Sequence, residues 1–258
     1  MTQLPIQMTV ALANDETPAS LCSRNALLVG RTARDFCRDA GFTFQNVVDG
    51  TPSALEALAD RCRANVDLLA ATAAVKVAER RYMIGEQILV RESLSRKTLR
   101  VCPRCLSQDI ESGRGPERTR PYGRLLWQIE PIRTCREHGI ALVAVSNDDH
   151  PHRVHDFAML VQSSLSDIHR LASEAPRRRW SPLEDHLAGR LKNPGYGEAL
   201  WLSTLPFYAA AKACEILGAV AAAVSASSRT PSPMRIGMRP GRSGMTSLQR
   251  ERQASGAC

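Results

Sequence analysis

The stretch that decides the fold covers residues 101–143 and reads VCPRCLSQDIESGRGPERTRPYGRLLWQIEPIRTCREHGIALV. It contains Cys102-x-x-Cys105 and, after 29 intervening residues, Cys135-x-x-His138. Zinc prefers four nitrogen or sulfur ligands in a tetrahedron, and a two-residue spacer lets one tight turn supply two of them. The gap between the pairs is longer than in the usual zinc ribbon, so it must carry structure of its own. The spacing therefore predicts one zinc ion bound by these four residues.

Two neighbours of the ligands support this interpretation. Pro103 is expected to pre-set a turn inside the first pair, and Gly139 gives the chain freedom to turn away after the second. The alternative is that the four are ordinary buried residues, or that two of the cysteines form a disulfide and the other residues have no joint role. The paired spacing favours zinc. The remaining cysteines stand singly and are interpreted as small core or surface residues: Cys22, Cys37, Cys62, Cys214 and Cys258.

The composition indicates a globular, basic protein. The chain has 258 residues, of which 43% are hydrophobic and 5% aromatic, with a formal net charge of +8. Of the 34 basic residues, 30 are Arg. This preference has two explanations: Arg binds phosphate oxygens through a bidentate pair of hydrogen bonds, or the genome has a codon bias that favours Arg. The net positive charge itself favours polyanionic partners.

Neither a signal peptide nor a membrane span is expected. The first 14 residues have no sustained apolar run. The longest apolar segment, residues 206–226, is interrupted by Lys212 and Glu215 and is expected to be too polar to cross a bilayer. We therefore expect a cytoplasmic protein, where reduced thiols are available to zinc.

The central stretch also resembles a family. Its run C-P-x-C-L-x-x-D from Cys102, then R-x-x-W-Q from Arg124, then C-x-x-H-G-x-x-L from Cys135 is similar to the zinc-binding core of TniQ proteins. A weaker resemblance extends upstream through Leu4-Pro5 and ETPASLCSR at residues 16–24, so that it covers residues 4–145. TniQ proteins are accessory proteins of DNA transposition.

The resemblance implies a role without catalysis. TniQ proteins help to choose the insertion site and connect bound double-stranded DNA to the AAA+ ATPase that recruits the transposase complex. This chain would then bind DNA, the ATPase and the transposase complex, bind one structural Zn²⁺ and lack enzymatic activity, and we leave a homodimer open. The residues agree, because a site with four protein ligands has no open position for water, and no G-x-x-x-x-G-K-[ST] loop is present.

The segments before the zinc stretch have helical patterns. Helices are expected over residues 17–29, from Thr32 to before Gly41, and from Thr51-Pro52, with a loop over residues 42–50. Asn65 is expected to cap a further helix, which gives helix-turn-helix character to residues 51–73. The alternative is a plain helical scaffold. TniQ proteins have helix-turn-helix character in their amino-terminal part, and the resemblance implies the same for this chain.

Around the ligands we expect mixed structure. Residues 87–101 fit a β-hairpin around the turn 93–97, and residues 109–119 fit a mobile loop. Residues 122–128 fit a short helix that carries Trp127 into the core. Residues 91–140 carry a net charge of +5. Basic residues near the two ligand pairs are expected to contact DNA phosphates: Arg96, Lys97, Arg100, Arg104, Arg118, Arg120 and Arg124.

The last third of the chain is expected to be helical. Helices are predicted over residues 156–175, from Ser181-Pro182 and over residues 198–226 with a boundary at Pro206, followed by a disordered basic tail from 227. A second cysteine pair that many TniQ proteins carry is missing here. His150, His152 and His155 are interpreted as part of a polar linker, although they leave open a second metal site or a nuclease centre.

The sequence thus predicts a mainly α fold with a small zinc-ribbon and β-hairpin module. The expected regions are residues 1–86, helical with helix-turn-helix character; 87–145, the zinc module; 146–226, helical; and 227–258, the tail. The predicted function is a DNA-binding adaptor of transposition. The alternatives are a zinc-ribbon transcription regulator and, from another class, a metal-dependent nuclease that uses the three histidines.

Overall fold

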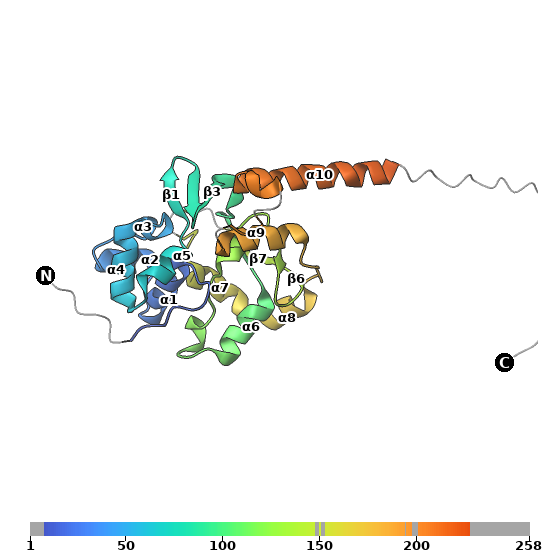
Figure 1. Cartoon of the computed structure of the whole chain (residues 1–258). Helices are drawn as coiled ribbons and strands as arrows, with labels where there is room; N and C mark the ends of the chain where they lie inside the picture. The colour runs from blue at the N-terminus through green and yellow to red at the C-terminus, as the bar shows by residue number, and fades with distance from the viewer. Residues whose placement is uncertain (1–7, 148–149, 151–152, 194, 198–200, 228–258) are drawn as a thin grey trace, which may run out of the picture. The chain divides into compact units, whose positions relative to one another are not determined.

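The fold was obtained as a computed structural model, which describes residues 8–147, 150, 153–193, 195–197 and 201–227. It is mainly helical, with three small antiparallel sheets between the helices. Residues up to Leu217 form one compact unit, and a second unit begins at Gly218. Figure 1 shows the amino-terminal helices gathered on one side of the first unit and α6 and α8 on another.

The amino-terminal helices begin where their capping residues predict. Thr17, Thr32 and Asn65 each accept a hydrogen bond from a backbone N–H of the first turn, which satisfies donors that a helix start leaves unpaired. Pro at the first helical position marks two of the starts. The expected helices are thereby confirmed as α1 (Pro18–Leu28), α2 (Ala33–Asp39), α4 (Pro52–Cys62) and α5 (Val66–Ala71).

One helix was missed. Residues 42–50 were expected to form a loop, but they contain α3 (Phe44–Val48), which is capped by the Thr43 side chain. The helix is short and its β-branched residues favour strands, so the pattern was weak. Packing overrides that preference, because Phe44 and Val47 are buried in the core with Leu21 and Leu58.

The turn between α4 and α5 has an unusual conformation. Arg63 has a φ of 54°, in the left-handed region, and lets the chain reverse without a glycine. The helix after the turn, Val66 to Ala71, carries no Lys or Arg, and Asp67 lies in its first turn. Recognition helices contact DNA through cations and polar groups, so the DNA-reading role of this helix pair stays a prediction.

The expected hairpin over residues 87–101 was wrong. Its two strands exist, but β3 (Gln87–Val90) pairs with β2 (Arg81–Ile84), which in turn pairs with β1 (Val75–Ala78). The strand β4 (Thr98–Val101) instead pairs with β7 (Val143–Asn147). The β4–β7 pair joins the two ends of the zinc stretch, so pairing across that stretch displaced the local turn.

The stretch between the ligand pairs is more ordered than the loop expected over residues 109–119. Helix α6 (Pro103–Ser112) fills its first part, followed by the 3₁₀ helix η2 (Glu117–Thr119). The short helix expected at 122–128 is the 3₁₀ helix η3 (Leu125–Gln128), and Trp127 is buried as expected. The strands β5 (Thr134–Cys135) and β6 (Ile140–Ala141) flank the second ligand pair.

The carboxyl-terminal helices follow their predicted starts. The expected helix over 156–175 is divided into α7 (Phe157–Leu165) and α8 (Ile168–Glu174). Ser181 and Glu184 form a capping box at the start of α9 (Pro182–Lys192). Later come the 3₁₀ helix η4 (Trp201–Thr204) and α10 (Phe207–Ser227). Of the tail predicted over 227–258, Ser227 ends α10, and the rest lies outside the described residues.

Helix α10 has a mixed character. Phe207, Ala210 and Ala211 are buried within the first unit, whereas Ile216 and Leu217 are exposed. Residues 207–225 are long and apolar enough to cross a membrane, which their interrupted sequence did not lead us to expect. A single helix that meets a length and composition test is weak evidence for a span.

Candidate metal centre

The first two ligands are fixed by the start of α6. Cys102 is the N-cap of this helix and Pro103 its first helical residue, so Pro103 starts a helix where we expected only a turn. Cys105 then lies in the first helical turn, on the same side as Cys102. Strand β4 delivers the chain to this point, and its pairing with β7 anchors it.

The other two ligands lie in the turn between β5 and β6. Cys135 closes β5, and its carbonyl oxygen accepts a hydrogen bond from the Gly139 N–H at 2.9 Å. Gly139 has a φ of 57°, which a residue with a side chain adopts at a cost, so the predicted role of this glycine is confirmed. The turn brings His138 back over Cys135.

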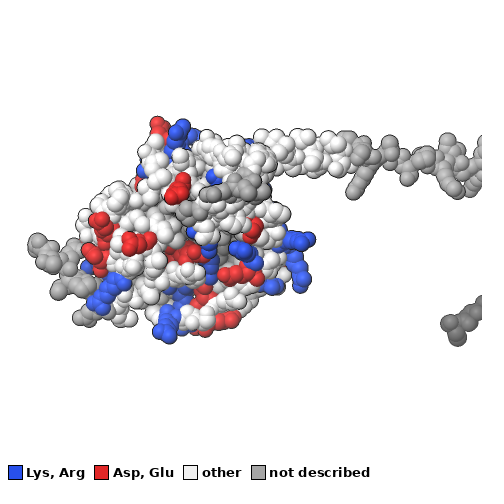
Figure 2. Space-filling model, viewed as in Figure 1, with Lys and Arg blue, Asp and Glu red and all other residues white. Residues whose placement is uncertain are grey.

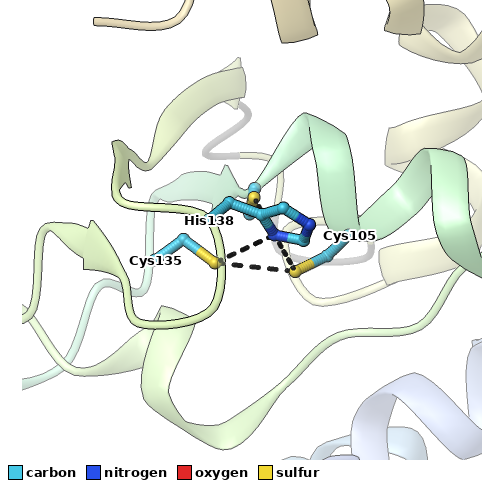
Figure 3. A group of neighbouring side chains, drawn as sticks. Cys105, Cys135 and His138 are labelled. Carbon is cyan, nitrogen blue, oxygen red and sulfur yellow. Dashed lines mark hydrogen bonds between the residues drawn. The ribbon is translucent and has the colours of Figure 1, made fainter. Parts of the chain in front are cut away.

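The four side chains converge on one point. The Nδ1 atom of His138 lies 3.5 Å from the Cys102 sulfur, 3.3 Å from Cys105 and 3.5 Å from Cys135. The sulfurs of Cys105 and Cys135 lie 3.6 Å apart, as Figure 3 shows together with the imidazole between them. All four donor atoms lie within 4.8 Å of one another.

This geometry fits a tetrahedral zinc ion. Zinc–sulfur bonds of about 2.3 Å and zinc–nitrogen bonds of about 2.05 Å place sulfur about 3.8 Å from sulfur and about 3.6 Å from nitrogen. The four donor-atom distances given above are close to these values. The three cysteines are buried, so water does not compete for the position between them. The cluster can therefore hold a metal ion, and its donor set is compatible with a structural zinc.

The three thiols lie close enough to shift one another's pKa values. Hydrogen bonding to Cys102 and Cys135, together with burial, raises the pKa of Cys105 far above its usual value. The same contacts with Cys102 and Cys105 lower the pKa of Cys135. Thiolates this close together repel one another, and a bound cation offsets that repulsion.

The core around the cluster extends beyond the predicted zinc module. Val101, Leu106 and Trp127 belong to it, and so do Phe157 and Val161 of helix α7. Side chains of the zinc stretch and of helix α7 therefore both pack around the metal site. Loss of the ion would expose a core that joins the zinc stretch to the helices that follow it.

Three of the predicted DNA-contacting residues are exposed. Lys97 precedes β4, Arg104 lies on the first turn of α6 and Arg118 lies in η2. On the face drawn in Figure 2, basic and acidic side chains are interspersed, and neither sign forms a continuous patch. These three residues are the predicted contacts that are most accessible to a phosphate backbone.

The other four candidates contact groups of the protein itself. Arg124 binds Asp109 through two hydrogen bonds, and Arg120 donates to the carbonyl oxygens of Ile110 and Gly115. Arg96 and Arg100 are largely buried, with side chains 17% and 12% exposed. Contacts between these four residues and DNA stay a prediction.

The predicted histidine cluster is only partly described, because His152 lies outside the described residues. Among the residues that the structure describes, the Cys102–His138 set is the one group of three or more metal-binding side chains in reach of a common ion. His155 lies instead in a cavity beside Arg96, and burial lowers its pKa to about 4.

Sequence reasoning missed a second buried network. The Glu16 carboxylate accepts hydrogen bonds from the Arg24 guanidinium at 2.7 Å and from the Ser20 hydroxyl at 2.8 Å. Ser20 accepts in turn from the Gly123 N–H, and the Arg24 Nε–H donates to the Thr119 carbonyl oxygen. The network ties α1 to the segment between the ligand pairs. Glu16, Ser20 and Arg24 stand in the ETPASLCSR segment at residues 16–24. Their spacing within that segment does not show that they contact residues about a hundred positions later in the chain.

Together these features define a class: a helical protein built around a Cys₃His cluster that can hold a metal ion, with its amino-terminal helix hydrogen-bonded to the zinc stretch. Residues 7–142 match the TniQ family, a range that covers more than half of the chain, and the protein therefore belongs to the TniQ family. Proteins of this family are DNA-binding accessory proteins of transposition. No curated protein and no solved structure matches the chain.

Proposed function

We propose that this protein is a non-catalytic adaptor of transposition that binds double-stranded DNA, helps to select the target site and links it to an AAA+ ATPase. The observation that carries the proposal is the closed metal cluster within a chain of the TniQ family. Four protein ligands complete a zinc tetrahedron, which leaves no position for a reacting water. The metal then serves the fold, and partners perform the chemistry.

Family membership favours this role over a zinc-ribbon transcription regulator. The matched range includes the amino-terminal helices as well as the metal cluster, so the resemblance is not limited to a ribbon. The hydrogen bonds from Arg24 to the Thr119 carbonyl oxygen and from the Gly123 N–H to the Ser20 hydroxyl join these two parts. We propose that they act as one rigid piece when DNA and ATPase are bound together.

The proposed DNA surface consists of Lys97, Arg104 and Arg118. Each phosphate contact that a cation makes releases counterions, so log K falls with log salt with a slope of about −0.9 per contact. The test is duplex DNA binding by the full chain across a series of salt concentrations. Replacing all three residues by Gln is expected to reduce that slope by up to about 2.7.

A second triple variant removes the same net charge elsewhere: Arg31, Arg38 and Arg80, each to Gln. These residues are also exposed on the surface. If both triple variants reduce the slope equally, net charge alone attracts DNA, and the assignment of the surface is wrong.

A further inference from the structure

A cavity of about 80 Å³ lies between the first turn of α1, strand β4, the helix η3 and the start of α7. Its walls combine apolar side chains with Arg96, Arg100, Arg124 and His155. Among the described residues that line it, none is Asp or Glu. A smaller hollow next to it shares Arg96 and His155. The cavity is therefore polar, cationic and without an acidic wall.

Two of these arginines each have a hydrogen-bond donor without an acceptor among the described residues. The Nε–H groups of Arg96 and Arg100 are buried, and within the described part of the chain neither finds a hydrogen-bond acceptor. A buried donor without a partner is destabilising, so such donors are rare unless something else occupies the site. Both cations face the same small space.

The acidic partners of Arg96 and Arg100 offset their charges only in part. Asp49 lies 3.9 Å from Arg96, and Glu130 lies 3.3 Å from Arg100 with its side chain 44% exposed. Burial accordingly lowers the pKa of both guanidinium groups. Arg124 differs, because its bidentate pair with Asp109 raises its pKa in spite of burial. Arg100 also donates to the carbonyl oxygens of Ile129 and Glu130, but the carboxylate partners of Arg96 and Arg100 balance their charges less closely than Asp109 balances Arg124.

The first turn of α1 adds a favourable field. Thr17 and Ala19 line the cavity, and the start of this eleven-residue helix carries the positive end of its dipole. The volume suffices for several water molecules, and thus for the four oxygens of a tetrahedral anion. Guanidinium groups bind such oxygens with a matched fork.

We propose that this cavity is a phosphate-binding site in which Arg96, Arg100 and the first turn of α1 hold a single phosphate group. Two sources share this chemistry: inorganic phosphate or a nucleotide free in solution, and the terminal 5′-phosphate of a DNA strand. The site is distinct from the exposed residues proposed to contact the DNA backbone. It stands on the cavity itself and does not depend on the role in transposition.

The test is calorimetric titration of the zinc-loaded full chain with inorganic phosphate, in chloride buffer of constant ionic strength. We expect saturable binding of one phosphate, which Arg96→Gln or Arg100→Gln weakens about tenfold or more because a charge-assisted hydrogen bond is lost. Arg91→Gln is the matched control, since Arg91 directly follows β3, is exposed and does not line the cavity. It should bind phosphate as the wild type does.

Zinc content and the thermal unfolding midpoint verify that each variant folds. Arg100→Lys, which keeps the charge and loses the fork, replaces Arg100→Gln if the latter is unfolded, and it should also weaken binding. The wild-type titration tests the proposal without any variant. No saturable binding by the wild type, or an equal loss in Arg91→Gln, overturns it.

The two sources are separated with DNA duplexes of one sequence that carry either a 5′-phosphate or a 5′-hydroxyl. If the source is a DNA end, the phosphorylated duplex binds more tightly, and inorganic phosphate removes the difference. If the source is a free phosphate, both duplexes bind equally while inorganic phosphate still binds. Either result supports the site, and the proposed backbone surface is tested separately by its own triple variant.

Discussion

The carboxylate of Asp109 accepts hydrogen bonds from both terminal nitrogens of Arg124, at 2.8 and 3.1 Å. Asp109 lies on α6, directly after the first ligand pair, and Arg124 lies before the second. The Arg124 guanidinium also stacks on Tyr122 and Trp127, at 4.0 and 4.7 Å from the ring centroids. The pair therefore fixes the segment between the two halves of the metal cluster.

Replacing Asp109 by Ala should destabilise the protein strongly. The side chains of Asp109 and Arg124 are only 8% and 16% exposed, so the variant leaves a largely buried cation without its counterion. Breaking such a pair costs about 3 kcal/mol or more. Urea unfolding of the zinc-loaded protein measures the loss.

The control for Asp109→Ala is Glu174→Ala, which breaks an exposed i,i+4 pair with Arg170 on α8. Exposed pairs of this type contribute about 0.5 kcal/mol or less. Equal losses in the two variants would contradict the structural role of the Asp109–Arg124 pair.

Removing one metal ligand should remove the metal. Cys105→Ser is expected to lose the zinc and to unfold without cooperativity, because binding free energies of about 10–16 kcal/mol at such sites become folding energy. Elemental analysis of the purified protein should find about one zinc in the wild type and none in the variant. Cys214→Ser, which changes a cysteine outside the cluster, should retain the metal.

A stable, cooperatively folded wild type that contains no metal would contradict the assignment of the cluster. Addition of a chelator provides the same test without a substitution. It should lower the unfolding midpoint of the wild type and leave that of Cys105→Ser unchanged.

The pH dependence of stability should include a contribution from His155. Burial lowers the pKa of this side chain to about 4, with Arg96 acting in the same direction and Asp49 opposing it. Between pH 6.5 and pH 4 the unfolded state therefore binds more protons than the folded state, and stability falls as the pH falls. The loss amounts to at most about 3 kcal/mol.

His155→Gln removes this titration, so its stability should fall less than that of the wild type over the same pH window. The comparison is made by urea unfolding in buffers without phosphate, since His155 lines the proposed phosphate site. Parallel pH profiles for the two proteins would show that His155 titrates with an ordinary pKa.

Local signals in the sequence predicted the metal cluster and most helix starts. The four ligands lie in two short pairs, and capping residues such as Thr17, Thr32 and Ser181 act within three residues of themselves. The interpretation of Trp127 as a packing residue also followed from its apolar neighbours and is confirmed.

Contacts over long distances could not be predicted in the same way. Strand β4 pairs with β7, more than forty residues later, and this partner displaced the local hairpin that the polar turn suggested. Arg124 and Arg24 form ion pairs with acidic side chains that the fold brings close to them. The sequence therefore did not show that these two arginines pair within the protein.

The most direct test of the central claim is an insertion assay with donor ends, transposase and the AAA+ ATPase, in which this protein is present or absent. The protein should change the frequency or the position of insertion, and the Cys105→Ser variant should not. Strand cleavage by the purified protein alone should stay at background with zinc or magnesium. Insertion that is the same with and without the protein, or cleavage that disappears in a His150/His152/His155 triple alanine variant, would contradict the adaptor role.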